Sequence, residues 1–296
     1  MGGVATPELA GAVAKSGALG MLCEYAPEPA PERMTHALDL AGGGGTVGMG
    51  FFGHWIDSDL ATFEIAAAWL RVVEVFWSVP DPKLVDRANA AGQALVTWQV
   101  GSAHDAVLAE DAGCDFVVAQ GVEAGGHVRG TMPRMELLDA VLETVTIPVV
   151  LAGGIATAED VRAAIDAGAS GARVGTRFVA TEESSAHPAY IDALVNAQSG
   201  DDTVLTTAFS GGWPDAPHRV LKSAVTAADA FEGAFVGNLV SHGDRQPIPR
   251  FAVSTPTRDV EGHVEAMALY AGHGVGEVRA VVPAAEVVAA LVSRLD

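Results

Sequence analysis

Two glycine-containing segments late in the chain have the composition of a phosphate-binding site. Residues 149–157 read Val-Val-Leu-Ala-Gly153-Gly154-Ile-Ala-Thr, and one strand–helix interval later the chain reads Val-Gly175-Thr176-Arg-Phe. Each segment is an apolar run that ends in glycine, which lets backbone N–H groups approach an anion without a Cβ atom in the way. The two would form neighbouring loops at the carboxyl ends of parallel strands, where α/β barrels bind phosphate. The alternative is that these glycines only turn the chain, but two correctly spaced segments favour phosphate.

Another segment, earlier in the chain, places a histidine in a glycine-rich loop. Residues 119–130 read Ala-Gln-Gly-Val-Glu-Ala-Gly-Gly-His-Val-Arg-Gly and follow another apolar run, so the loop is expected at the same edge of the sheet. Gly125 and Gly126 permit a tight loop that can press against a flat ligand. His127 is the group there that can exchange a proton near neutral pH. A lone histidine is more often structural, but this position beside a predicted phosphate pocket favours a catalytic role.

The last such segment, Leu269–Gly276, has three glycines at alternate positions around His273. The pattern suggests a close backbone approach that includes Gly272, although an ordinary loop would look the same.

The elements that must position these loops repeat along the chain. Short apolar runs, typical of strands buried on both faces of a parallel sheet, occur at Leu19–Leu22, Val47–Phe52, Val72–Trp77, Ala94–Val100, Phe116–Gln120, Val149–Ala152 and Ala172–Val174. Helical stretches alternate with them at Pro7–Ser16, Pro31–Leu40, Asp57–Leu70, Pro82–Ala91, Ala103–Ala112, Arg134–Thr144 and Ala158–Ala167. This alternation predicts an α/β fold of the TIM (β/α)8 type, formed by residues 1–296 as a single domain.

The predicted barrel is one strand short, because the chain opens at Met1-Gly2-Gly3, which has the composition of a strand-to-helix loop. Either the start lies upstream or the barrel closes in another way. After Phe178 the repeat stops. We expect residues 181–270 to be an insertion over the barrel mouth, with no clear strand in 219–265, and a final helix in Val282–Leu295.

Composition narrows the classes of function. The chain has 17 basic and 37 acidic residues, a net charge of −20, which disfavours nucleic acid and anionic lipid as partners. No apolar run is long enough to cross a membrane, and the start lacks the basic region of a signal peptide. Cys23 and Cys114 are expected to be reduced core residues of a cytoplasmic protein. No cluster of metal-ligand spacing is present, so no metal is predicted.

Together these segments resemble the nitronate monooxygenase family, formerly called 2-nitropropane dioxygenases, which are FMN-dependent TIM barrels. The residues that carry the resemblance are Met1–Ala10 with Gly17–Gly20, Ala119–His127, Leu151–Ile155, Gly175–Phe178 and Tyr270–Gly274, in family order. The string Gln-Gly-x-Glu-Ala-Gly-Gly-His is the most specific of them.

The resemblance implies roles for individual residues. The cofactor-binding positions that it implies, around a catalytic His127 near the flavin, are Met1, Gly2, Gln99, Gln120, Gly125, Gly126, Gly153, Gly154, Gly175, Thr176, Gly272 and His273. The family oxidises alkyl nitronates by electron transfer to FMN with consumption of O2, so the implied ligands are FMN, a small nitronate and O2. The oligomeric state stays open, a homo-oligomer included.

Several positions depart from the family pattern. Gln99 stands where a lysine or another polar residue is usual, Gly50 where asparagine is usual, and His273 where glutamine is common. Large side chains that could line an apolar pocket, or belong in part to the barrel core, are Phe51, Phe52, Phe76, Trp77 and Trp98.

Three other functions remain open at this point. The first is an NAD(P)H-dependent reductase of a quinone or an enoyl thioester on the same scaffold. The second is a flavin-free aldolase or epimerase, which needs a Schiff-base lysine or paired acids; the lysines are Lys15, Lys83 and Lys222, all in expected helices or loops. The third is a non-catalytic flavoprotein.

Overall fold

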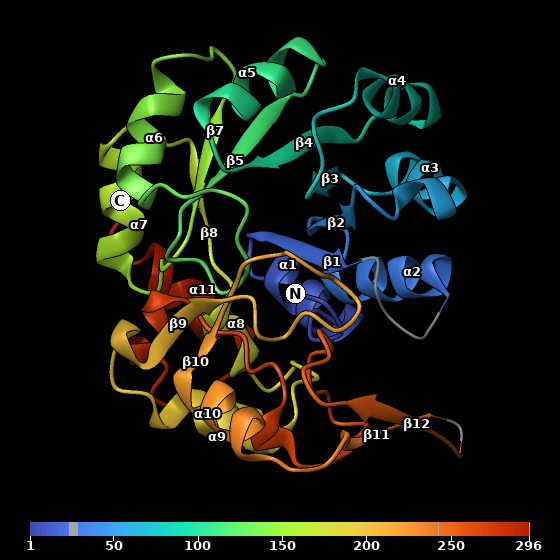
Figure 1. Cartoon of the computed structure of the whole chain (residues 1–296). Coiled ribbons are helices and arrows are strands. Elements are labelled where there is room, and N and C mark those ends of the chain that lie inside the picture. The colour runs from blue at the N-terminus through green and yellow to red at the C-terminus, as the bar shows by residue number, and fades with distance from the viewer. Residues whose placement is uncertain (24–28, 242, 296) are drawn as a thin grey trace.

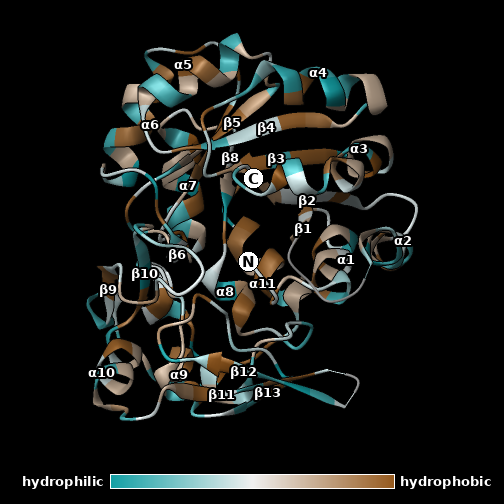
Figure 2. Ribbon diagram, turned by 45° about the vertical axis from the view of Figure 1, so that its right-hand side comes forward, coloured by the Kyte–Doolittle hydropathy of each residue, from teal (hydrophilic) through white to brown (hydrophobic). Residues whose placement is uncertain are grey.

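A parallel sheet of seven strands, adjacent in chain order, forms the centre of the computed structural model, which describes residues 1–23, 29–241 and 243–295. Its strands are β1 (Leu19–Cys23), β2 (Thr46–Phe52), β3 (Val72–Phe76), β4 (Leu95–Val100), β5 (Phe116–Gln120), β7 (Val149–Ala152) and β8 (Gly171–Arg173). All seven predicted strands are confirmed, and six of them lie at the predicted apolar runs. Strand β8 is the short Gly-Ala-Arg segment that begins one residue before the run predicted at Ala172–Val174. Figure 2 shows the hydrophobic colour along β3 and β4.

Seven helices alternate with these strands and cover the outside of the curled sheet (Figure 1). They are α1 (Pro7–Lys15), α2 (Ala30–Ala41), α3 (Leu60–Trp69), α4 (Pro82–Ala91), α5 (Ala103–Asp111), α6 (Arg134–Leu142) and α7 (Ala158–Asp166). The side chain of Thr157 accepts from the N–H of Asp160 and the Asp160 carboxylate accepts from that of Thr157, a reciprocal cap that starts α7. Helix α3 begins later than expected, because Asp59 caps it after the short helix η1 (Ile56–Ser58).

The architecture is a TIM-type α/β fold, and β1 and β8 are the two edges of its sheet. The predicted final helix is confirmed as α11 (Ala284–Val292), which begins after Pro283 and packs against α1 and α7. Segments from both ends of the described chain therefore lie side by side.

Residues 176–278 add a smaller group of elements below the sheet in Figure 1. These are α8 (Thr176–Val179), α9 (Pro188–Asn196), η2 (Gly200–Asp202), β9 (Thr203–Thr206), β10 (His218–Leu221), α10 (Lys222–Ala230), β11 (Phe235–Ser241), β12 (Asp244–Pro249), β13 (Val260–Gly262), η3 (Val264–Ala266) and η4 (His273–Glu277).

The expectation of no strand in residues 219–265 is wrong, because β11 pairs antiparallel with β12 and β13. These strands lack the apolar signal of a buried sheet, since most residues of β11 and β12 are partly or fully exposed. Strand β12 also contains Pro247 and Pro249, which a strand at the edge of a sheet can hold without loss of a ladder hydrogen bond.

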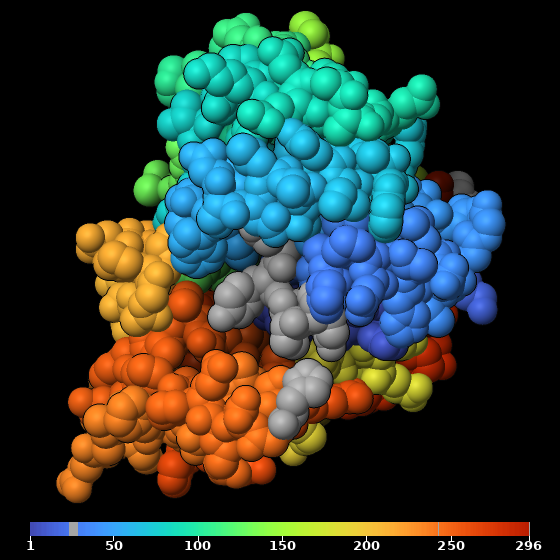
Figure 3. Space-filling view, turned by 90° about the vertical axis from the view of Figure 1, so that its right-hand side faces the viewer, coloured from blue at the N-terminus to red at the C-terminus, as the bar shows by residue number. Residues whose placement is uncertain are grey.

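Two hydrophobic cores support the two groups of elements. The first lies between the parallel sheet and its helices and contains Phe51, which meets Phe63 edge-on at 5.2 Å between ring centroids. Trp98 is fully buried there, and its indole N–H donates to the carbonyl of Ser78 at 3.1 Å. The second core includes Tyr190 and Phe209 and also Val4, from the start of the chain. Figure 3 shows the orange residues of the second group on the surface beneath the blue and cyan part.

The contact between α1 and β1 depends on Gly20. A Cβ atom added at Gly20 would lie 1.9 Å from the carbonyl oxygen of Ala10, a backbone atom of α1 that cannot rotate away. We expect Gly20→Ala to destabilise the protein by about 2 kcal/mol or more, because the helix must move off the sheet. The measurement is the free energy of unfolding in urea.

Gly44→Ala is the matched control, because a Cβ atom there would have no neighbour within 4 Å. Equal loss of stability in the two variants would contradict the packing role of Gly20.

Candidate active site

The turn after β7 is held in place by Arg134, the first residue of α6. Gly153 and Gly154 both have left-handed φ angles, +117° and +64°, which favour glycine. The Arg134 guanidinium donates to the carbonyl of Gly153 at 2.9 Å and to the carboxylate of Asp160 at 2.7 Å. The carboxylate of Glu123 accepts from the backbone N–H of Arg134 at 2.9 Å. The glycine turn is thereby tied to α6, to α7 and to the loop after β5.

Burial alone would raise the pKa of Asp160. Hydrogen bonds from Ala156 and Thr157, and the charge of Arg134, instead hold that pKa below its usual range. The carboxylate therefore stays charged and keeps Arg134 in position.

The backbone at this turn has free donors. The N–H groups of Gly153, Gly154 and Thr176 have no acceptor within residues 1–23, 29–241 and 243–295. Thr176 is the first residue of the short helix α8, whose first N–H groups have no partner inside the helix. Unpaired amides next to a left-handed glycine turn are the donor set that a phosphate takes.

The four glycine-containing segments singled out in the sequence meet at this edge of the sheet. A Cβ atom added at Gly125 would lie 2.5 Å from the backbone nitrogen of Gly272, and one added at Gly154 would lie 3.3 Å from the Cβ of His273. The N–H of Gly272 donates to the hydroxyl of Thr176 at 3.0 Å. Five predicted cofactor-binding residues are thus close neighbours.

The start of the chain reaches the same place. A Cβ atom added at Gly175 would lie 3.9 Å from the sulfur of Met1. Gly2 makes no such close approach, since a Cβ atom there would have nothing within 4 Å. The structure therefore brings Met1 to the glycine segments and leaves Gly2 open beside them.

Gln120 and His127 each present a buried polar atom without a partner. The Gln120 side-chain nitrogen donates to the carbonyl of His127 at 3.1 Å, whereas its oxygen Oε1 has no partner within residues 1–23, 29–241 and 243–295. Residues Gly126–His127 form the short strand β6 and pair with β10, so that His127 lies opposite His218. The ring nitrogen Nε2 of His127 is buried and likewise has no partner among the described residues. A buried unpaired polar atom is costly in a finished core, so both atoms fit a site that a polar ligand completes.

The ring of His127 is held neutral. Burial lowers its pKa from 6.5 to about 3, with smaller contributions from His218 and His54. At neutral pH the imidazole therefore carries one proton, can donate or accept a hydrogen bond, and is a weak base.

Aromatic side chains cover His127. The indole of Trp213 stacks on the imidazole, with 3.9 Å between centroids and 21° between planes. Trp77 meets His127 edge-on at 5.8 Å, and Trp77 is a non-glycine residue with a left-handed φ of +65°. Such strained residues cluster at functional sites. We call the set Phe52, His54, Trp55, Phe76, Trp77 and Trp213 the aromatic cap.

The five large side chains that could line a pocket or belong to the core divide between the cap and the core. Phe52, Phe76 and Trp77 belong to the cap, whereas Phe51 and Trp98 are core residues. Trp213 escaped the sequence analysis, and the only signal was the turn-rich run Ser210–Pro214 around it.

Gln99 lies in a separate group inside the sheet. Its side-chain oxygen accepts from Arg173 at 3.0 Å, and the same guanidinium is paired with Glu74, a buried carboxylate on β3. This charged pair also escaped the sequence analysis, because β3 and β8 are about a hundred residues apart.

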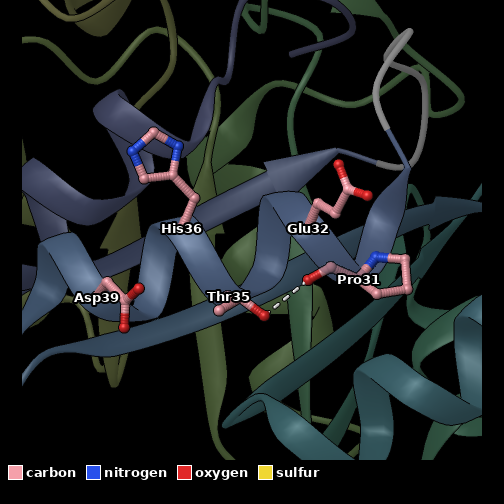
Figure 4. A pocket seen from close by; sticks show the side chains of 5 residues that line it. All are labelled: Pro31, Glu32, Thr35, His36 and Asp39. Carbon is pink, nitrogen blue, oxygen red and sulfur yellow. Dashed lines mark hydrogen bonds between the residues drawn. The ribbon is translucent and has the colours of Figure 1, made fainter.

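A shallow hollow elsewhere on the surface contains none of these residues. It is lined by Pro31, Glu32, Thr35, His36 and Asp39 of α2, where the Thr35 hydroxyl donates to the carbonyl of Pro31 at 2.9 Å (Figure 4). In the described part of the chain, no three His, Cys, Asp or Glu side chains are placed to hold a metal ion. No helix within residues 1–23, 29–241 and 243–295 is long and apolar enough to span a bilayer.

The sequence matches a known protein family over most of its length. The family model for nitronate monooxygenase matches residues 63–294, more than three quarters of the chain. The chain belongs to the nitronate monooxygenase family. A probable nitronate monooxygenase of Staphylococcus aureus (strain Newman) is 37% identical over 145 residues. That match covers 46% of this chain and only 40% of the length of the relative.

Solved structures of similar fold match nearly all of the chain. Nitroalkane oxidase from Streptomyces ansochromogenes is 28% identical, with a TM-score of 0.77 over all of this chain and 93% of that one. FabK from Thermotoga maritima is 26% identical, with a TM-score of 0.75 over 99% of this chain and 90% of that one. The nitronate monooxygenase fold thus extends over the smaller group of elements as well as the sheet.

The low pKa of His127 predicts a specific loss of stability in acid. An unfolded histidine takes up its proton near pH 6.5, whereas His127 in the folded protein does so near pH 3. Between these values the unfolded chain binds more protons, so the free energy of unfolding falls as the pH drops below about 6.5. We expect the Tm of His127→Gln to fall less than that of the wild type between about pH 7.5 and pH 5.5.

His36→Gln, at a half-exposed histidine of α2, is the control and should follow the wild type. Equal loss of Tm in the wild type and in His127→Gln would show that His127 is not held neutral by the fold.

Proposed function

We propose that this chain binds FMN at the glycine segments and oxidises alkyl nitronates with O2. The observation that carries the proposal is the pair of buried unpaired atoms, Nε2 of His127 and Oε1 of Gln120, next to loops with free backbone donors. The family membership and the name of the Streptomyces neighbour support nitro compounds as the substrate class.

The cofactor would be held mainly by backbone. The N–H groups of Gly153, Gly154 and Thr176 would take its phosphate, and the left-handed turn leaves room for that group. Gly125, Gly126, Gly175, Gly272 and His273 would form the surrounding wall, with Met1, Gly2 and Gln120 toward the ring. Gln99, which is hydrogen-bonded to Arg173, would bind the cofactor from inside the sheet. Bound FMN would supply the redox chemistry, accepting an electron from the nitronate and passing it to O2.

His127 would orient the substrate. A neutral imidazole can donate a hydrogen bond to a nitronate oxygen through Nε2, whereas a base with a pKa of about 3 removes a proton from a neutral nitroalkane poorly. We therefore propose the nitronate anion, and not the neutral nitroalkane, as the substrate. The stacked Trp213 would keep water from this face of the site.

We propose that residues 181–270 remain part of the same domain and supply this cover, because Trp213 belongs to them and their core includes Val4. A reducing compartment such as the cytoplasm suits the two cysteines, both buried and free. Burial raises the pKa of Cys114 to about 12, so this thiol would not act as a nucleophile.

One alternative keeps support from the structure. The aromatic cap would also accept a quinone or the apolar part of an enoyl thioester, reduced with NAD(P)H.

The test of the proposed function is the visible absorption spectrum of the flavin-loaded protein without oxygen. We expect the flavin bands to persist after NADH and to bleach after the ethyl nitronate anion, because the proposed enzyme takes its electrons from the nitronate and not from NADH. Neutral nitroethane, added before it ionises, should bleach the bands far more slowly. Bleaching by NADH alone would overturn the proposal in favour of the reductase.

His127→Ala should keep its flavin and lose most turnover with ethyl nitronate. Unchanged turnover in this variant would remove His127 from the mechanism.

Gly154→Asp should prevent FMN binding. A Cβ atom at this left-handed position would lie 3.0 Å from the Cβ of Glu123, and the new carboxylate would repel the phosphate. The measurement is the flavin-to-protein ratio after incubation with excess FMN.

Gly168→Asp is the control, because Gly168 is also left-handed, with φ of +101°, but follows the far end of α7. It should lose stability and retain FMN. Full flavin occupancy in Gly154→Asp would contradict the phosphate assignment.

A further inference from the structure

The stacking of Trp213 on His127 fills a defined slot. One face of the indole lies on the imidazole, while Phe52 and Trp77 meet the indole edge-on, each at 5.1 Å. His54 lies at 4.5 Å and Trp55 at 5.3 Å. Trp213 is only 7% exposed, although it belongs to a loop of turns. The walls of the slot are therefore ring faces and ring edges.

The slot carries no charged group among the rings that form it. Its two titratable walls are His54 and His127, and burial lowers the pKa of each, so both are neutral at physiological pH. The other walls are Phe52, the last residue of β2, Trp55, which follows β2, and Trp77, which follows β3. Such a slot attracts a flat apolar group and gives nothing to a short alkyl chain beyond its area.

The loop that carries the indole is anchored at its base. The N–H of Gly211 donates to the carbonyl of Phe251 at 2.9 Å, and the N–H of Val253 donates back to Gly211 at 2.9 Å. Gly212 has a left-handed φ of +97° and Asp215 one of +56°, on either side of Trp213. Backbone contacts thus fix the base of the loop, while ring contacts hold the indole.

We propose that Trp213 determines specificity, and that the substrate carries a flat conjugated group, aryl or alkenyl, which enters the stack between Trp213 and His127. This rests on the proposed function, because His127 is taken as the group beside the reacting atoms. The nitronate carbon is bonded to the conjugated group. Stacking of that group would therefore place the nitronate beside Nε2 of His127. A substrate without such a group would have to displace Trp213 from His127 without gaining a stacking contact.

The test compares the nitronates of phenylnitromethane and nitroethane in the flavin-loaded wild type and in Trp213→Phe and Trp213→Leu. We expect the wild type to favour the phenyl compound in kcat/KM by about 10-fold or more, since aromatic contacts contribute about 2- to 10-fold each. Trp213→Phe should keep most of this preference and Trp213→Leu should lose about 10-fold of it. In Trp213→Leu the preference should be lost mainly because KM for the phenyl compound rises.

Trp69→Leu is the matched control, because Trp69 ends α3, is half exposed and lies outside the cap. It should leave both values of kcat/KM unchanged. A wild type that prefers the ethyl compound, or an unchanged ratio in Trp213→Leu, would overturn the proposal. Tm measurements on both variants at Trp213 show whether a lost preference reflects lost folding, and Trp213→Phe keeps the test valid if Trp213→Leu does not fold.

A binding measurement separates this inference from the proposed function. Nitrobenzene and nitroethane, neither of which needs to react, are titrated into the protein by calorimetry. Tighter binding of nitrobenzene that weakens in Trp213→Leu supports the stacking slot even if no nitronate bleaches the flavin. Nitronate turnover together with equal binding of the two compounds would leave the function in place and overturn the stacking slot.

Discussion

The site depends on how closely three backbone segments approach one another at the carboxyl edge of the sheet. Gly125 and Gly272 lie so near that a Cβ atom on either would meet backbone of the other segment. The N–H of His273 donates to the carbonyl of Glu123 at 2.9 Å across the same contact. Because backbone cannot rotate aside as a side chain can, glycine is required here on steric grounds. The loop that ends in His127 is thereby aligned with the turn at Gly154.

Hydrogen bonds and an ion pair of Arg134 also hold these segments together. Arg134 joins the glycine turn to Asp160, and its own N–H is held by Glu123, so one arginine connects α6, α7 and the loop after β5. The guanidinium and Asp160 are each about one-fifth exposed, which screens the pair less than a surface pair.

Sequence reasoning succeeded where a pattern is local. The seven strands of the parallel sheet, and the cap at Thr157, are visible because apolar runs and capping residues act within a few positions. Strands β11 and β12 escaped because their side chains are mostly exposed and pairing, not burial, defines them. The stack of Trp213 on His127 and the pair of Arg173 with Glu74 join residues 86 and 99 positions apart, and no local pattern marks them.

The burial that lowers the pKa of His127 bears on the role proposed for it. An imidazole enclosed by Trp213, Trp77 and His218 cannot hold a second proton at neutral pH, so its chemistry is reduced to one donor and one acceptor. A substrate that still has to lose a proton would need a stronger base than this ring. A substrate that arrives as an anion needs only a donor of fixed direction, and pairing between β6 and β10 fixes the backbone from which the ring projects. The unpaired Nε2 and the aromatic cap therefore favour orientation of the substrate over its deprotonation.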